Sequence, residues 1–202
     1  MKRVLFGPLL RLVYRPWIRG ARHVPTTGAA ILASNHQAVV DSFFLAVMLD
    51  RQLVFIGKQE YFTGSGIKGR LVSGFMRGVG TIPVDRSGGR AGEAALATGL
   101  RRLREGGLFG IYPEGTRSPD GTPKEGKTGA AMVARKAKAD ILPCSIYHEG
   151  KLKFRRKITV RFGEIIPFAD LGLGETPNKR QNREATDKIM AAITKLWEMK
   201  HD

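Results

Sequence analysis

Short apolar runs alternate with amphipathic stretches along most of this chain. Six runs rich in Val, Ile, Leu and Phe predict β-strands, and they cover residues 29–33, 53–56, 80–84, 108–112, 141–146 and 158–162. The stretches between these runs predict helices over 40–50, 67–78, 90–105 and 127–138. Apolar residues that share one side predict a closing helix over 179–199.

Strands that alternate with helices are typical of an α/β protein, so we expect a single domain with a mixed, mostly parallel central sheet flanked by helices. In such sheets, ligands bind at the loops that leave the carboxyl ends of the strands. The 202 residues suit one domain with a sizeable core, and no internal repeat or low-complexity tract interrupts them. We therefore assign residues 21–202 to that domain.

Residues 1–20 have a different pattern and are predicted to form an amphipathic helix that precedes the sheet. Over 3–19, apolar residues recur at spacings of three and four with arginines between them, although Pro8 and Pro16 would limit the helix. Arginine together with Trp, Tyr and Leu suits a helix at a membrane surface, and packing on the protein's own core explains the pattern equally well. The longest apolar run, 43–49, falls short of the roughly 20 residues that cross a bilayer.

The chain is strongly basic, with 34 Lys and Arg against 18 Asp and Glu and a net charge of +16. Such a charge attracts nucleic acid, an anionic bilayer or phosphorylated substrates, and charge alone does not choose among them. The single cysteine, Cys144, excludes an internal disulfide and lies in an apolar run, which predicts a buried structural thiol. Four scattered histidines and one cysteine make no ligand cluster, so we expect neither a metal nor a bound cofactor.

One histidine and one aspartate stand where a strand is predicted to give way to a helix. His36 lies in the loop after strand 29–33, and Asp41 opens the next helix. A carboxylate beside the imidazole would fix its tautomer while the other ring nitrogen takes a proton from a hydroxyl group. By spacing alone, an Asp41 that only caps the helix and a His36 that is an ordinary loop residue are the commoner arrangement.

Four segments in order resemble the sequence blocks of the glycerophospholipid acyltransferase family, which includes the 1-acylglycerol-3-phosphate acyltransferases. They are 35–41 (Asn-His-Gln-Ala-Val-Val-Asp), 80–86 (Gly-Thr-Ile-Pro-Val-Asp-Arg), 112–118 (Tyr-Pro-Glu-Gly-Thr-Arg-Ser) and 141–144 (Ile-Leu-Pro-Cys). Segment 58–62 (Lys-Gln-Glu-Tyr-Phe) resembles a further stretch that the family carries between its first two blocks. The third block has Tyr112 where Phe is usual. The resemblance covers about residues 20–165.

The resemblance implies a role for each matched residue. His36 would be the general base and Asp41 the residue that orients it, with direct attack of the acceptor hydroxyl on a thioester and no acyl-enzyme. Arg86 and Arg117 would bind the acceptor phosphate, because a guanidinium group matches two phosphate oxygens at once. The other residues implied to bind substrate, each with a structural alternative, are Glu114, Gly115, Thr116, Lys58 and Lys127.

Two other classes of function remain alternatives. Residues 121–128 fit the phosphate-loop pattern of nucleotide hydrolases, but residues 113–120 separate them from the preceding predicted strand, whereas such a loop begins at a strand end. The basic segment 151–157 would suit nucleic-acid phosphates, an anionic bilayer or an exposed strand edge. No helix-turn-helix, zinc-ligand set or RNA-binding aromatic signature accompanies it.

The sequence therefore predicts an acyltransferase of phospholipid synthesis. The donor would be acyl-CoA or acyl-carrier protein, and the acceptor would be lysophosphatidate or glycerol 3-phosphate. We expect a peripheral protein on the cytoplasmic face of the cell membrane, docked by the N-terminal helix and a basic surface, with an anionic membrane rather than nucleic acid as its partner.

Overall fold

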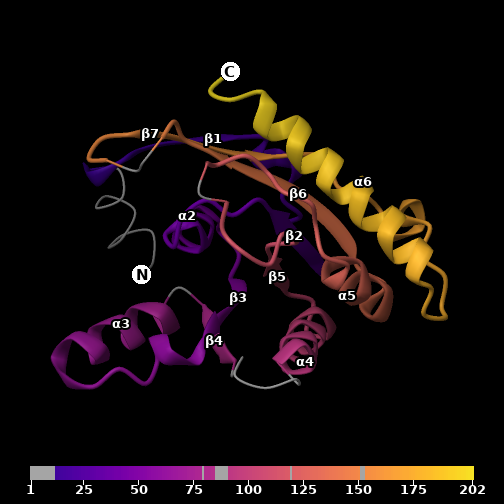
Figure 1. Cartoon of the computed structure of the whole chain (residues 1–202), viewed down its shortest axis with the longest axis horizontal. Coiled ribbons are helices and arrows are strands. Elements are labelled where there is room, and N and C mark those ends of the chain that lie inside the picture. The colour runs from indigo at the N-terminus through magenta and orange to yellow at the C-terminus, as the bar shows by residue number, and fades with distance from the viewer. Residues whose placement is uncertain (1–11, 79, 85–90, 119, 151–152) are drawn as a thin grey trace.

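A seven-stranded sheet forms the centre of the molecule in this computed structural model, which describes residues 12–202 except 79, 85–90, 119 and 151–152 (Figure 1). Its strand order is β1-β7-β6-β2-β5-β3-β4. The pairs are parallel except that β6 and β7 are antiparallel, which confirms the mixed, mostly parallel sheet. The strands are β1 (Arg15–Arg19), β2 (Ala30–Ser34), β3 (Leu53–Lys58), β4 (Thr81–Val84), β5 (Leu108–Ile111), β6 (Asp140–Tyr147) and β7 (Lys157–Phe162).

Helices cover both faces of the sheet because its central strands are apolar on both sides. Alternate residues of β2 point to opposite faces, so Ile31 joins one core and Leu32 the other. The first core includes residues of α4 (Ala91–Arg104), α5 (Gly129–Ala137) and α6 (Lys179–Glu198). The second includes residues of α2 (Asp41–Met48). The five predicted helices are confirmed, the remaining one being α3 (Gly66–Gly78).

Three short 3₁₀ helices complete the described secondary structure: η1 (Ala21–His23), η2 (Gln59–Tyr61) and η3 (Phe168–Leu171). Helix α6 begins at Lys179, as the sequence pattern predicted, and Asn178 caps its start. The Asn178 side chain accepts hydrogen bonds from the backbone N–H groups of Arg180 and Gln181. Among the described residues, no helix combines the length and apolar character that spanning a membrane requires.

The helix expected over residues 3–19 is wrong in its second half. Arg15–Arg19 is strand β1, which pairs in parallel with β7 at the edge of the sheet, and residues 1–11 lie outside the described part of the chain. Pro16 has no N–H to donate to a helix and is tolerated on an edge strand, while Trp17 and Ile18 favour extended backbone. Pairing with β7 therefore outweighs the helical spacing of the apolar residues.

The parallel strands place several loops at one edge of the sheet. Ser34, the last residue of β2, pairs with Cys144 of β6, and Ala33 pairs with Ile111, the last residue of β5. The loop after β2, the loop 112–128 after β5 and the loop after β6 consequently leave the sheet on the same side. This carboxyl edge is where the predicted chemistry was expected to lie.

Candidate active site

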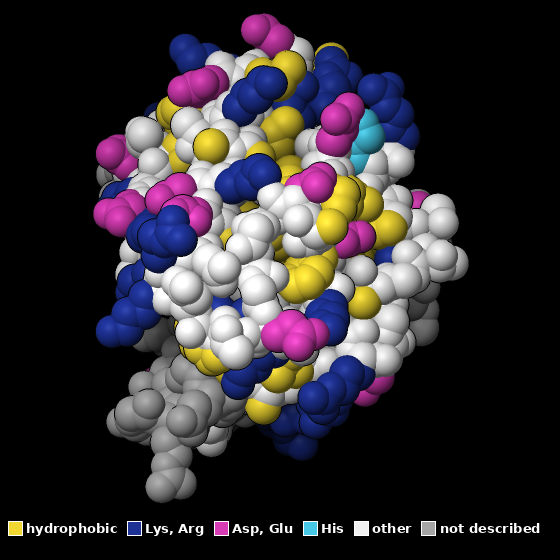
Figure 2. Space-filling view, turned by 90° about the vertical axis from the view of Figure 1, so that its right-hand side faces the viewer, with side chains coloured by type: hydrophobic (Ala, Val, Ile, Leu, Met, Phe, Trp, Pro, Cys, Tyr) yellow, Lys and Arg dark blue, Asp and Glu magenta, His cyan; other side chains and the backbone are white. Residues whose placement is uncertain are grey.

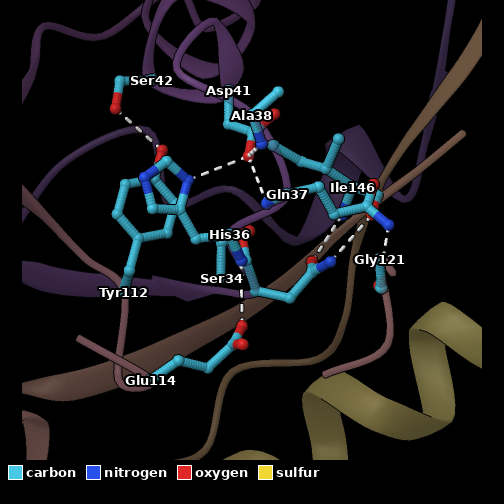
Figure 3. Close-up of polar contacts among 11 residues, drawn as sticks. Ser34, His36, Gln37, Ala38, Asp41, Ser42, Tyr112, Glu114, Gly121 and Ile146 are labelled. Carbon is cyan, nitrogen blue, oxygen red and sulfur yellow. Dashed lines mark hydrogen bonds and ion pairs between the residues drawn. The ribbon is translucent and has the colours of Figure 1, made fainter. Parts of the chain in front are cut away.

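Two side chains meet where β2 ends and α2 begins. His36 lies in the loop after β2, and Asp41 is the first residue of α2. The Nδ1 atom of His36 lies 2.9 Å from the Oδ2 atom of Asp41 (Figure 3). Because a carboxylate only accepts hydrogen bonds, the bonded tautomer carries its hydrogen on Nδ1, which leaves the Nε2 lone pair to accept a proton.

The Asp41 carboxylate is held by more than the imidazole. Asp41 is fully buried, and its Oδ2 atom also accepts the backbone N–H groups of Gln37 at 2.7 Å and Ala38 at 2.8 Å. These bonds offset the cost of burying a carboxylate and close the turn between strand and helix. The alternative in which Asp41 only caps the helix does not match the structure, because the amides that it holds precede α2 and no described side chain caps that helix.

The ring of His36 is stacked on the ring of Tyr112, the residue that follows β5. The two ring centroids lie 4.0 Å apart and the planes differ by 10°. Phe55 of β3 stacks on Tyr112 as well, at 5.3 Å between centroids. The Tyr112 hydroxyl lies 2.8 Å from Oγ of Ser42. Burial, and then the charge of Asp41, raise the pKa of Tyr112 well above its ordinary value, so the hydroxyl stays neutral.

Glu114 joins the loop after β5 to the loop after β2. Its Oε1 atom accepts the backbone N–H of His36 at 2.9 Å, and its Oε2 atom accepts the backbone N–H of Lys124 at 3.2 Å. Glu114 is 3% exposed, and burial raises the pKa of its carboxyl group even though the two amide bonds oppose that rise. The geometry matches the structural alternative for Glu114, a brace between two backbones.

Further bonds hold the loop 112–128 against the histidine loop. The backbone N–H of Ser118 donates to the carbonyl oxygen of His36 at 2.7 Å, and the Gln37 side chain donates to the carbonyl oxygen of Gly121 at 2.7 Å. His36 is thus bound through its ring, its N–H and its carbonyl group. Side chain and backbone together fix the position of the proposed base.

Asn35 has a role that the sequence reasoning missed. Its buried side-chain amide donates to the carbonyl oxygen of Ile146 at 2.9 Å and accepts the N–H of the same residue at 2.8 Å. This reciprocal pair ties the residue before His36 to the end of β6. A polar amide that directly follows a fully buried, mostly apolar strand is the signal that could have revealed it.

Four of the predicted substrate-binding residues lie on the surface of the loop 112–128 or at its end. Gly115, Thr116, Arg117 and Lys127 are all exposed. Gly115 has φ of +70°, and a Cβ atom built there would lie 3.1 Å from Cδ of Lys127, so glycine suits both the turn and the contact. Arg117 directly precedes Ser118, whose N–H binds the His36 backbone. Among the described residues, no hydrogen bond or ion pair engages the Arg117 guanidinium.

For the other two predicted binding residues, Lys58 and Arg86, the structure gives only their position relative to the strands. Lys58 is the last residue of β3, at the carboxyl edge of the sheet. Arg86 lies outside the described residues, just beyond the end of β4 at Val84. Their roles remain predictions.

Cys144 and the described acidic and histidine side chains bear on two kinds of chemistry, attack by a thiolate and catalysis by a metal ion. Cys144 is fully buried, as predicted, and burial raises the pKa of its thiol far above the ordinary value, which opposes thiolate formation. Within the described part of the chain, no group of three His, Cys, Asp or Glu residues is arranged to hold a metal ion.

The phosphate-loop alternative does not match the fold around residues 121–128. Residues 112–120 separate this segment from the end of β5, and the N–H of Lys127 donates to the carbonyl oxygen of Pro113 at 2.7 Å. A phosphate loop instead runs directly from a strand into a helix and turns its N–H groups toward the ligand. Here residues 121–128 form the second half of the loop 112–128, which is hydrogen-bonded to the backbone of His36.

Comparison with known proteins decides the family. A family model described as Acyltransferase matches residues 15–147, which include the site. The chain belongs to the Acyltransferase family. An acyltransferase from Bacillus subtilis, named 1-acyl-sn-glycerol-3-phosphate acyltransferase, is 28% identical over 178 residues, which are 86% of this chain and 84% of that one. The human protein 1-acyl-sn-glycerol-3-phosphate acyltransferase beta is 30% identical over 79% of this chain and 59% of its own length.

A solved acyltransferase structure has the same fold. The crystal structure of the 1-acyl-sn-glycerophosphate (LPA) acyltransferase PlsC from Thermotoga maritima matches all of this chain and 78% of that one, with a TM-score of 0.71 at 22% sequence identity. At this identity the likeness concerns the fold alone. It agrees with the single α/β domain seen here.

Proposed function

We propose that this acyltransferase transfers a fatty acyl group from acyl-CoA or acyl-carrier protein to the free hydroxyl group of 1-acyl-sn-glycerol 3-phosphate, producing phosphatidic acid. The single observation that carries the proposal is the 2.9 Å contact between His36 Nδ1 and Asp41 Oδ2 at the carboxyl edge of the sheet. The names of the Bacillus and human relatives support this acceptor over glycerol 3-phosphate.

The proposed reaction passes the acyl group directly from the thioester to the hydroxyl, by addition and then elimination. Nε2 of His36 takes the proton of the acceptor hydroxyl as its oxygen attacks the thioester carbonyl carbon. The Asp41 carboxylate stabilises the charged imidazolium through Nδ1. The tetrahedral intermediate then collapses, the carbon–sulfur bond breaks, and the leaving thiolate takes the proton from His36. The products are the ester and the free thiol.

The side chains around the base support direct transfer over an acyl-enzyme. Cys144 is buried with its pKa raised, and Ser34 is also buried. The Ser118 hydroxyl donates to the carboxylate of Asp120, whose lowered pKa makes it a weak base. None of these three groups is hydrogen-bonded to a histidine that could activate it as a nucleophile.

Cations at the same edge would bind the acceptor phosphate. Arg117 and Lys127 are exposed on the loop that also holds His36, so an anion bound there would stand near the base. We assign the same role to Arg86, and we place Lys58, Gly115 and Thr116 along the substrate path. We place the enzyme at an anionic membrane, where its lysolipid acceptor resides.

The test is acyl transfer by the wild type and by His36→Ala, with acyl-CoA and acyl-carrier protein as donors and lysophosphatidate and glycerol 3-phosphate as acceptors. Phosphatidic acid should form from lysophosphatidate and be lost in His36→Ala, which should stay folded although it loses the bond to the buried Asp41 carboxylate. His201→Gln is the matched control, because His201 bonds Thr159 instead of a carboxylate, and it should stay active. Full activity in folded His36→Ala would refute the mechanism.

A further inference from the structure

Of the aromatic side chains whose exposure the structure gives, the most exposed lies in the turn between β6 and β7. Phe154 is 70% exposed, and its neighbours Lys153 and Arg155 are exposed as well. The N-terminal segment packs beside this turn: the N–H of Arg155 donates to the carbonyl oxygen of Val13 at 2.7 Å. This bond joins two segments that are far apart in the sequence, each of which carries both basic and apolar side chains.

The N-terminal segment adds apolar and cationic side chains of its own. Leu12 is 61% exposed and Trp17 is 42% exposed. Two cations contact the Trp17 ring: its centroid lies 4.5 Å from Lys157 Nζ and 5.0 Å from the Arg19 guanidinium carbon. We define the hairpin patch by six residues: Leu12, Arg15, Trp17, Lys153, Phe154 and Arg155.

The register of the sheet places the hairpin patch on the same edge as the active site. Tyr147 pairs with Thr159 across β6 and β7, and Cys144 pairs with Ser34 of β2, so the chain after Tyr147 leaves the sheet on the side where His36 follows β2. Arg15 opens β1 beside Lys157 at that same edge. Figure 1 shows the turn and α2 on the same side of the sheet, away from α5 and α6.

The edge that carries the hairpin patch is basic, whereas the face formed by α5 and α6 carries charges of both signs. On the face of α5 and α6, acidic and basic side chains are mixed (Figure 2), and Arg183 pairs with both Glu125 and Asp187. No ion pair among the described residues includes a member of the hairpin patch. The first forty residues contain no Asp or Glu, and one carboxylate, Glu149, shares a hollow with the basic residues of the turn.

We propose that the hairpin patch docks the enzyme on an anionic phospholipid bilayer, with Phe154, Trp17 and Leu12 among the lipids and the flanking cations on lipid phosphates. Exposed aromatic and aliphatic side chains surrounded by cations suit the boundary between headgroups and acyl chains. Because the patch shares its edge with His36, docking would turn the active site toward the lipid. This proposal identifies the surface of the enzyme that meets the membrane. It rests on the proposed function for the identity of the lysolipid acceptor.

Among the described residues, α3 carries a competing membrane surface. Ile67 and Leu71 of α3 are 80% and 69% exposed, one helical turn apart. The hairpin patch is favoured because its aromatic side chains, Phe154 and Trp17, are themselves exposed beside cations, whereas the two exposed residues of α3 are aliphatic. The competition can be decided by substitution at each surface.

The experiment measures sedimentation of the whole protein with vesicles of phosphatidylglycerol and phosphatidylcholine in equal parts, and with phosphatidylcholine alone, without substrate. The wild type should bind the mixed vesicles and lose affinity as salt rises. Lys153→Ser/Arg155→Asn should bind about thirtyfold more weakly, since each basic residue contributes about a factor of five, and Asn tolerates the positive φ of Arg155. Phe154→Ser should bind at least about tenfold more weakly.

Matched controls separate this surface from net charge and from other apolar residues. Arg101→Ser/Arg104→Ser removes two exposed charges from α4 and should bind vesicles nearly as the wild type does. Loss of binding in Ile67→Ser/Leu71→Ser but not in Phe154→Ser would overturn the proposal in favour of α3. Tighter retention on double-stranded DNA than on mixed vesicles, lost in Lys153→Ser/Arg155→Asn, would overturn it in favour of nucleic acid.

Activity assays distinguish failure of docking from failure of the proposed function. The hairpin variants should match the wild type on a short-chain lysophosphatidate in true solution and lose activity on the same headgroup carried in vesicles. A wild type that binds vesicles through the patch but transfers no acyl group would leave docking supported and refute the enzyme proposal. Equal activity of Phe154→Ser and wild type on vesicle-borne acceptor, with equal binding, would refute docking.

Discussion

The carboxylate of Glu114 bridges the backbones of His36 and Lys124, at 2.9 Å from one N–H nitrogen and 3.2 Å from the other. Glu114 belongs to the third matched sequence block, yet it contacts the proposed base through the backbone. It holds the loop after β5 against the loop after β2. Its contribution to catalysis should therefore come through the position of His36.

Glu114→Gln should lower kcat and leave the acceptor KM within about twofold. An amide has one accepting oxygen where the carboxylate has two, so one of the two backbone N–H groups loses its partner. We expect a loss of about 1–3 kcal/mol in the free energy of unfolding and a ten- to hundredfold lower kcat, since small displacements of a base are costly. Denaturant unfolding and steady-state kinetics would measure both. A raised acceptor KM with unchanged stability would instead show that Glu114 binds substrate.

The sequence predicted most elements of the sheet and the contact between His36 and Asp41 because both depend on local pattern. Strands such as β2 and β6 are buried on both faces and read as apolar runs, and His36 and Asp41 are joined by one short turn. Strand β1 was missed because its residues are mostly exposed, so its extended form depends on β7. The role of Glu114 was left open because its partner His36 is 78 residues away in the chain.

The stack of Tyr112 on His36 predicts different outcomes for two substitutions. Tyr112→Phe keeps the ring and loses the hydrogen bond with Ser42, so kcat should stay within about threefold, with stability lower by about 0.5–1.5 kcal/mol. Tyr112→Leu removes the aromatic face and should lower kcat about tenfold, the upper range for an aromatic pair. Steady-state kinetics and thermal melting would check both.

Ser42→Ala provides the control for the hydroxyl pair. It should reproduce the stability loss of Tyr112→Phe, and the double variant should lose little more, because both remove the same bond. Equal kcat in Tyr112→Leu and wild type would show that the stack does not position the base.

Asp120 predicts a pH-dependent contribution of the site loop. The Ser118 hydroxyl, and then the Thr122 N–H, bind its carboxylate and lower its pKa below the ordinary value. The unfolded chain therefore binds the proton more readily. The stabilising effect of Asp120 should be present above about pH 4 and be lost as pH falls toward the lowered pKa.

Denaturant unfolding of wild type and Asp120→Asn across pH would show this. The difference in the free energy of unfolding should favour the wild type near neutral pH and shrink below about pH 4. Asp170→Asn is a suitable control, because Asp170 is an exposed aspartate on η3 rather than on the site loop. A difference that stays constant with pH would mean that the Asp120 charge does not hold the loop.

Arg117→Ala should act on the acceptor. Its guanidinium is exposed on the loop that holds His36 and meets no described ion-pair partner, so it is available to an anion. Loss of a charge-assisted bond to phosphate should raise the acceptor KM about ten- to hundredfold, with the KM for acyl-CoA unchanged. Arg117→Lys should recover part of this loss, because a lysine keeps the charge without the two-pronged geometry. Arg101→Ala, an exposed arginine of α4, controls for the change in net charge. If Arg117→Ala changed kcat alone, the arginine would act on the reacting atoms or on the loop, and the phosphate would have to be bound elsewhere.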